Sequence, residues 1–179
     1  SSAEFLHDPA EPIPSLGGAA LFNLSPDEAI TAEHWADLNA QAGSRDQRPI
    51  ESRCVTFTSA PLDEPLEITG PVTALVYLSS SAVDTDIVVR LCDVYPDGRS
   101  MLLCDGIQRA RYRTSPFKPD LLQPDSPVEL KVDLWATSNL FRAGHRIRVI
   151  LSSSSYPRFD VNPGTGQSMF ANTTPVKAL

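Results

Sequence analysis

The sequence predicts an all-β protein, a jelly-roll β-sandwich that carries one short helical insertion. Apolar and polar residues alternate in several segments, which is the period of a strand with one buried face. The chain also holds 16 prolines among its 179 residues, and proline is unfavourable inside long helices. Turn-forming clusters separate the alternating segments at spacings typical of a sandwich. A chain of this length builds about one domain.

The N-terminal part of the chain differs in character from the rest. Residues 1–24 are rich in proline and glycine and are predicted to form an extended arm. Residues 25–43 are predicted to form a helical insertion, with a helix over 26–40 that begins at a Ser-Pro pair and is stopped by Gly43. The sandwich itself is predicted to occupy residues 44–179.

Three segments have the alternation of half-buried strands. In 128–134 the valines and leucines share one face, and the charged residues share the other. The segment 146–151 repeats this pattern with its isoleucine, valine and leucine at alternate positions. The segment 54–59 does so with Val55 and Phe57 facing inward.

Two further segments, 72–78 and 87–92, are apolar on both faces, which predicts central strands covered on each side. Two packed sheets follow from these patterns. Between strands, "DVYPDGRS" contains an Asp-Gly turn signal, so 87–94 is predicted to pair antiparallel with 99–104. More strands are expected at 66–69 and 107–113. The total is about eight, as a jelly roll requires.

Charge and hydropathy exclude two classes of partner. The formal net charge of −7 argues against nucleic acid, because phosphate binding needs clustered Lys and Arg. Arg109, Arg111 and Arg113 do alternate, but we expect them to be paired or solvated. No apolar run approaches the ~20 residues of a membrane span, so a membrane is not expected as a partner either.

Cysteines and aspartates give little support for a metal or any other cofactor. Three cysteines lack the spacing of metal ligands: Cys54, Cys92 and Cys104. Buried free thiols are expected, and a bridge between Cys92 and Cys104 is the alternative. Five aspartates lie near one another in the sequence: Asp84, Asp86, Asp93, Asp97 and Asp105. Calcium is the alternative there, but Asp84 and Asp86 precede a strand and Asp97 suits a turn, so no metal is predicted.

No catalytic residue is predicted in this chain. The sequence lacks a Gly-x-Ser-x-Gly nucleophile elbow, and Ser168 in "GTGQSMF" is only a partial match. The three histidines, His7, His34 and His145, are expected to be surface or hydrogen-bonded structural residues. Trp135 lies on the polar face of its strand, and we predict that it contacts another domain.

Six segments, in this order, resemble the C-terminal domain of the CocE/NonD serine hydrolases, which is the X-Pro dipeptidyl-peptidase C-terminal domain family. They cover about residues 8–166: "DPAEPIPSLGG", "DQRPIESR", "EPLEITGPV", "SSSAVDTDIVVRLCDVYPDGRSMLLCDGIQRARYR", "DLWATSNLFRAGHRIRV" and "SSSYPRFDVNPGTG". The resemblance implies a jelly roll similar to galactose-binding domains. It also implies an α/β-hydrolase catalytic domain N-terminal to this chain. The chain would then be a non-catalytic domain that packs on that domain and helps to form its acyl pocket.

One pair of pocket residues carries over from cocaine-esterase-like members of the family. These members have a Leu-Phe pair after the Gly-Gly of the arm, and "GGAALF" places Leu21 and Phe22 there. An apolar wall suits an aromatic or aliphatic acyl group. The alternative is that both side chains fix the arm to the sandwich.

The segment 153–166, "SSSYPRFDVNPGTG", is predicted to be an ordered connection near a domain interface. Its serines and Asn162 can bond a loop backbone, and its prolines and glycines restrict the loop's conformation. Arg158 and Asp160 lie two residues apart and are candidates for anchoring neighbouring strands or the catalytic domain.

Several expectations concern the whole protein. Family members have a further strand after this loop, so two alternatives are expected: either that strand is missing here and leaves an unpaired edge, or the domain closes differently. An unpaired edge could pair with a second copy, so a homodimer is a candidate assembly. A cytoplasmic location is expected. The alternative function is a stand-alone carbohydrate- or ligand-binding jelly-roll module, because a fold does not fix a function.

Overall fold

The computed structural model describes residues 3–19, 42–168, 171 and 173–179. The predicted helix over 26–40 lies outside the described residues, as do Leu21, Phe22 and His34. Within them, the one α-helix, α2, is the single turn Arg48–Glu51. None of the described helices is long and apolar enough to cross a membrane.

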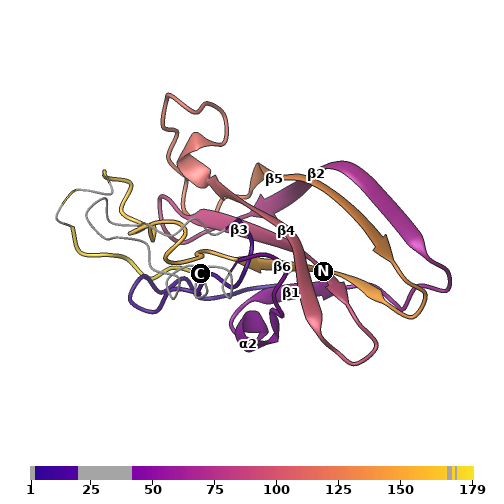
Figure 1. The fold of residues 1–179 in the computed structure, drawn as a ribbon. Coiled ribbons are helices and arrows are strands. Elements are labelled where there is room, and N and C mark those ends of the chain that lie inside the picture. The colour runs from indigo at the N-terminus through magenta and orange to yellow at the C-terminus, as the bar shows by residue number, and fades with distance from the viewer. Residues whose placement is uncertain (1–2, 20–41, 169–170, 172) are drawn as a thin grey trace, which may run out of the picture.

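Two antiparallel sheets form the molecule (Figure 1). The strands are β1 (Val55–Thr58), β2 (Leu66–Leu78), β3 (Asp86–Val94), β4 (Ser100–Arg109), β5 (Val128–Phe141) and β6 (Arg146–Ser152). One sheet has the order β1-β6-β3-β4, and the other consists of β2 and β5. The predicted β-sandwich is therefore confirmed.

The strand pairing is nested. β1 pairs with β6, β2 pairs with β5, and β3 pairs with β4. A ribbon of antiparallel pairs therefore crosses from one sheet to the other, which is the winding of a jelly roll. The predicted hairpin is confirmed, since Val94 lies opposite Ser100. About eight strands were expected, and the described residues form six.

The core lies between the two sheets. Every residue of β3 is buried, and Ile87, Val89 and Leu91 form one cluster with buried side chains of β5. The alternation in β5 matches the prediction: Leu130, Val132 and Leu134 are buried, and the residues between them are exposed. The three cysteines are free thiols.

The two sheets approach each other closely at Gly106 of β4. A Cβ at this position would lie 1.9 Å from the backbone oxygen of Asp133 in β5. No side chain fits there, so glycine allows the backbones of the two layers to touch.

Three predictions about strands were wrong, and Phe57, which was predicted to face inward, is 43% exposed. The segment 66–69 is not a separate strand, because it is the start of β2. The segment 72–78 is not covered on both faces: β2 alternates, and Leu75 and Tyr77 are exposed on its outer side. The segment 107–113 is not a separate strand, because β4 continues through it to Arg109 and is followed by the 3-10 turn η1 (Ala110–Tyr112). Successive apolar residues cannot reveal whether a second layer exists to cover them.

Candidate functional site

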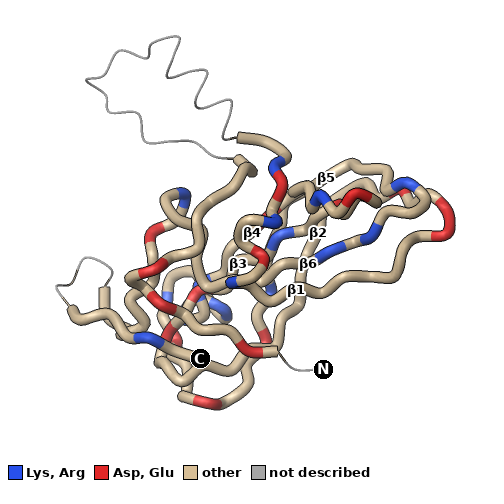
Figure 2. Tube along the Cα trace, turned by 90° about the horizontal axis from the view of Figure 1, so that it is seen from below, with Lys and Arg blue, Asp and Glu red and all other residues tan. Residues whose placement is uncertain are grey.

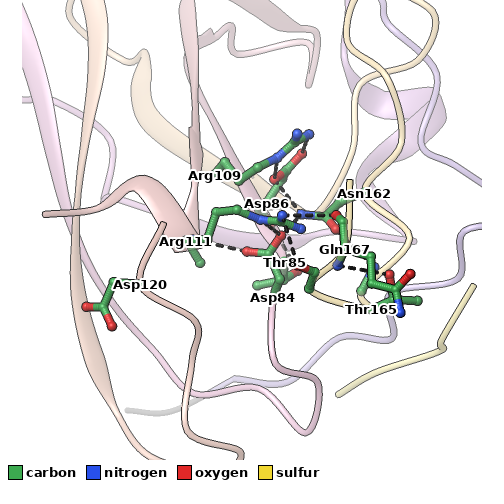
Figure 3. A network of polar contacts seen from close by, with 12 residues as sticks. Asp84, Thr85, Asp86, Arg109, Arg111, Asp120, Asn162, Thr165 and Gln167 are labelled. Carbon is green, nitrogen blue, oxygen red and sulfur yellow. Dashed lines mark hydrogen bonds and ion pairs between the residues drawn. The ribbon is translucent and has the colours of Figure 1, made fainter. Parts of the chain in front are cut away.

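One end of the sandwich is a platform of three loops, which we call the loop end. It consists of the β2–β3 loop (79–85), the β4–β5 connection (110–127) and the segment after β6 (153–168). Figure 3 shows the polar side chains that join them. The loop end is the candidate site because loops positioned by a rigid scaffold commonly carry binding functions.

A buried ion pair connects the first two loops, and a second ion pair lies beside it at the ends of β3 and β4. Arg111 Nε lies 2.7 Å from Asp84 Oδ2, and the side chains are only 7% and 0% exposed. Arg109 holds both oxygens of Asp86 through two bonds of 2.8 Å. Asp86 and Arg109 are direct partners across the β3–β4 ladder, so strand register brings them together. The backbone N–H of Arg111 also donates to Asp84 Oδ1 at 3.0 Å.

The prediction that the alternating arginines are paired is confirmed. The third member, Arg113, bonds Asp120 at 2.6 Å. The three do not share one strand face, however, because β4 ends at Arg109. The turn η1 lets each guanidinium reach a different carboxylate.

Asn162 connects the third loop to the same carboxylates. Its Nδ2 donates to Asp84 Oδ2 at 2.8 Å and to Asp86 Oδ1 at 2.9 Å, while its Oδ1 accepts the Gly164 N–H at 2.9 Å. These oxygens face nitrogen donors, whereas calcium requires clustered free oxygens. Among the described residues no group of three or more His, Cys, Asp or Glu could hold a metal ion.

The segment 153–166 is an ordered connection, as predicted, and it binds the N-terminal arm. Ser154 Oγ accepts the Ile13 N–H at 2.8 Å, and Ser155 Oγ lies 2.9 Å from Ser15 Oγ. His7 Nε2 donates to the Asn162 carbonyl at 2.9 Å, so His7 Nδ1 accepts the bond of 2.7 Å from Ser153 Oγ.

Both described histidines therefore have structural roles. His7 fixes the arm, and His145 Nδ1 lies 2.8 Å from Asp93 Oδ1 with its ring against Tyr95. Neither histidine is bonded to an exposed serine of the kind that nucleophilic catalysis requires.

Arg158 and Asp160 have different surroundings. Arg158 is partly buried and its Nη1 bonds both oxygens of Asp105 in β4, at 2.7 and 2.5 Å, so it anchors a neighbouring strand. Asp160 is exposed. The arm crosses this ion pair at Gly18, where a Cβ would lie 2.9 Å from Arg158 Nη1.

The base of the segment that contains Leu21 and Phe22 is also close to Arg158. Gly18 and Gly43 exchange two backbone hydrogen bonds of 2.8 and 3.0 Å, which hold the two ends of the intervening chain together. Sequence reasoning placed the arm and the 153–166 loop separately, but the structure brings them into contact.

Trp135 lies at a β-bulge on the outer face of β5. Leu134 and Trp135 stand opposite the single residue Val72, because the register shifts between Pro71 and Thr73. Trp135 has φ of 68° and is 73% exposed. Its backbone N–H donates to Asp133 Oδ1 at 2.8 Å. Positive φ is costly for a bulky residue, and bulges redirect side chains. The strain here directs the indole toward solvent, as the sequence predicted.

Comparison with known proteins supports one family. Residues 6–177 match the X-Pro dipeptidyl-peptidase C-terminal non-catalytic domain. Cocaine esterase from Rhodococcus sp. (strain MB1 Bresler) is 44% identical over 168 residues, which cover 93% of this chain and 27% of the esterase. The chain thus spans about a quarter of this relative's length.

Solved structures agree with this match. An aminopeptidase from a marine sediment Thaumarchaeota archaeon is 33% identical with a TM-score of 0.80, covering 97% of this chain and 29% of that protein. An α-amino acid ester hydrolase is 29% identical with a TM-score of 0.75 and covers the same shares. The chain belongs to the X-Pro dipeptidyl-peptidase C-terminal domain family of CocE/NonD-type hydrolases, in which it is the non-catalytic β-sandwich domain.

Proposed function

We propose that this chain serves a serine hydrolase that cleaves ester or amide bonds through an acyl-enzyme, and that it packs on the catalytic domain beside the acyl pocket. The proposal rests on the match to cocaine esterase, which covers 93% of this chain but only 27% of the esterase. In such a mechanism the nucleophile, the general base and the oxyanion donors act together, and this sequence contains no nucleophile elbow.

The test is to label the native protein that contains this chain with a fluorophosphonate. The protein is captured with an antibody against the chain, and its mass is read after labelling. A labelled species much heavier than 19.5 kDa is expected. An unlabelled species of the chain's own size would contradict the proposal and favour a stand-alone binding module.

Leu21 and Phe22 are proposed to line the acyl pocket. They follow Gly18, whose bonds to Gly43 and contact with the Arg158–Asp105 pair fix the start of the segment. Phe22→Ala in the whole enzyme is expected to change the relative kcat/KM values for small and large acyl groups. Leu140→Ala, an exposed apolar residue of β5, is the control. If Phe22→Ala lowers stability and leaves the relative rates unchanged, Phe22 belongs to a core.

Trp135 is proposed to contact another domain of the same protein. A carbohydrate module would use exposed rings as stacking platforms, and Tyr77 is exposed on the same outer face. Tyr77 lies five residues along β2 from Val72, the partner of the bulge, which is about 17 Å of strand. That separation exceeds one sugar ring, so a domain contact is favoured. Calorimetry that detected glycan binding lost in Trp135→Ala would favour the module instead.

A further inference from the structure

The β4–β5 connection contains a short loop, "RTSPFKPD" (113–120), whose two ends are tied together. Arg113 Nη2 lies 2.6 Å from the carboxylate of Asp120, and Nη1 bonds the Ala110 carbonyl at 3.0 Å and the Asp120 carbonyl. The Asp120 N–H donates to the Arg111 carbonyl at 2.7 Å. The loop is therefore bonded to Arg111, whose side chain forms the buried ion pair with Asp84.

The tip of the loop is also constrained. Ser115 Oγ accepts the backbone N–H groups of Phe117 and Lys118, each at 3.3 Å. Pro116 and Pro119 flank these two residues and restrict their backbone. The tip thus holds one conformation before any partner binds, which reduces the entropy lost on binding.

Phe117 at this tip is 93% exposed. A side chain so exposed contributes almost no burial to the fold of this domain. Single exposed apolar residues are common on surfaces. This ring differs because the Arg113–Asp120 pair joins the ends of its loop, and the buried Arg111–Asp84 pair lies at the base of the loop. Large rings that fill a pocket on a partner are the residues that dominate binding energy.

The position of the loop indicates what it meets. In Figure 1 the loop rises beyond the layer formed by β2 and β5, the layer whose outer face carries Trp135 and Tyr77. The loop therefore projects on the same side of the molecule as this outer face, and we refer to the loop and the face together as one surface. Nearly three quarters of the matched esterase lies outside the region that this chain covers. A parent protein of similar length would therefore contain a large further portion that could contact this surface.

We propose that the catalytic portion of the parent protein docks on this surface and that Phe117 is an anchor inserted into an apolar pocket of that portion. Lys118 follows Phe117 in the sequence, so we expect a carboxylate at the rim of the pocket. The inference rests on the proposed function, because it requires a catalytic portion in the same protein. It adds the contact surface and the anchoring residue.

Hydroxyl-radical footprinting of the intact parent protein tests the inference without any substitution. Phe117 is compared with Phe57, which is 43% exposed and lies in β1 of the other sheet, away from the outer face of β2 and β5. After normalisation to the unfolded protein, we expect Phe117 to be oxidised about tenfold more slowly than Phe57, because an anchor is fully desolvated. Oxidation of Phe117 as fast as Phe57 would overturn the inference.

Fluorophosphonate labelling of the same preparation separates the two proposals. If the protein is labelled while Phe117 is unprotected, the proposed function stands and this inference fails. If the protein is unlabelled and Phe117 is unprotected, both fail. Protection that disappears on dilution, together with a dimer in sedimentation, would identify a second copy as the occupant and overturn the inference.

Variants of the parent protein provide a second measurement. Phe117→Ala should make the catalytic portion and this domain unfold in separate transitions, whereas Phe117→Leu should keep them coupled. Phe57→Ala, at an exposed ring of the other sheet, is the matched control and should leave the unfolding of the two portions coupled. Because Phe117 contributes almost no burial within this domain, its replacement does not threaten the fold. Coupled unfolding in Phe117→Ala would contradict its role as an anchor.

Discussion

The two ends of the β3–β4 hairpin use the same residue types in different surroundings. At the loop end, Asp84 and Arg111 form an ion pair that is 0% and 7% exposed. At the turn end, Asp97 and Arg99 form a pair of similar length, 2.8 Å, that is 55% and 48% exposed. Figure 2, with acidic and basic residues coloured along the chain, shows that such residues are spread over the whole molecule. Burial, rather than pairing, therefore decides what an ion pair contributes to stability.

The turn-end pair serves a local conformation. Asp97 Oδ1 accepts the Arg99 N–H at 3.1 Å across Gly98, which has φ of 89°. This backbone bond, followed by the bond from the Arg99 side chain, holds the pKa of Asp97 below its usual value. The loop-end pair instead joins segments 27 residues apart, and removing one partner would leave the other charge buried.

The largest effect is expected for Asp84→Asn. Arg111 would lose its counter-charge in a buried site, and breaking a buried pair typically costs about 3–5 kcal/mol. We expect the free energy of unfolding, measured by urea denaturation, to fall by this amount. A change as small as that of Asp97→Asn would show that water or another group compensates Arg111.

The next effect distinguishes two glycines of the same hairpin. Gly106→Ala would place a Cβ against the backbone of Asp133 and force the sheets apart, which we expect to cost about 3 kcal/mol. A Cβ on Gly98 would have no atom of the described residues within 4 Å, but Gly98 has a positive φ, so Gly98→Ala should cost only about 1 kcal/mol. Equal losses in thermal or urea unfolding would mean that the layers separate easily at Gly106.

A third effect concerns Cys92, which lies between the two ends, and it appears only at alkaline pH. Burial raises the pKa of the Cys92 thiol to about 12. The folded state thus holds this proton more tightly than the unfolded state, whose thiol titrates near pH ~8.5. Its contribution to stability is complete below pH ~8.5 and is lost as the pH rises toward about 12.

We expect Cys92→Ala to flatten the alkaline fall in the free energy of unfolding, whatever constant offset the smaller side chain adds. Cys104→Ala should flatten the fall by nearly the same amount up to pH 10.5, because burial raises the pKa of Cys104 to about 11 and both folded thiols stay largely protonated there. Urea denaturation at pH 8 and pH 10.5 measures both. A wild-type slope that persists in Cys92→Ala would show that the thiol is accessible to solvent.

The smallest effect is expected for Asp97→Asn. Both side chains of its pair are exposed, and such pairs contribute little because water and salt screen them. Asn also keeps an oxygen that can accept the Arg99 N–H. The urea midpoint should be unchanged within error at low and high salt. A large loss at low salt would show that burial is not the deciding factor.

Local patterns in the sequence predicted much of the sandwich. The alternation in 128–134 gave the faces of β5 correctly, and the Asp-Gly turn gave the pairing of Val94 with Ser100. The prediction of a strand covered on both faces failed at Leu75 and Tyr77, because an apolar residue in a strand does not reveal whether a second layer covers it. The Phe117 loop was missed, although an apolar residue between two prolines was a visible signal.

The sequence by itself determined the family, the turn of the hairpin and the inward faces of several strands, since these depend on ordered motifs and on neighbours a few residues apart. Only the tertiary structure decided that Asp84, Arg111 and Asn162 meet, because their partners are 27 and 78 residues away. It also decided that Arg158 bonds Asp105, 53 residues away in the sequence. Contacts between residues far apart in the chain depend on how the layers pack, and no local period encodes them.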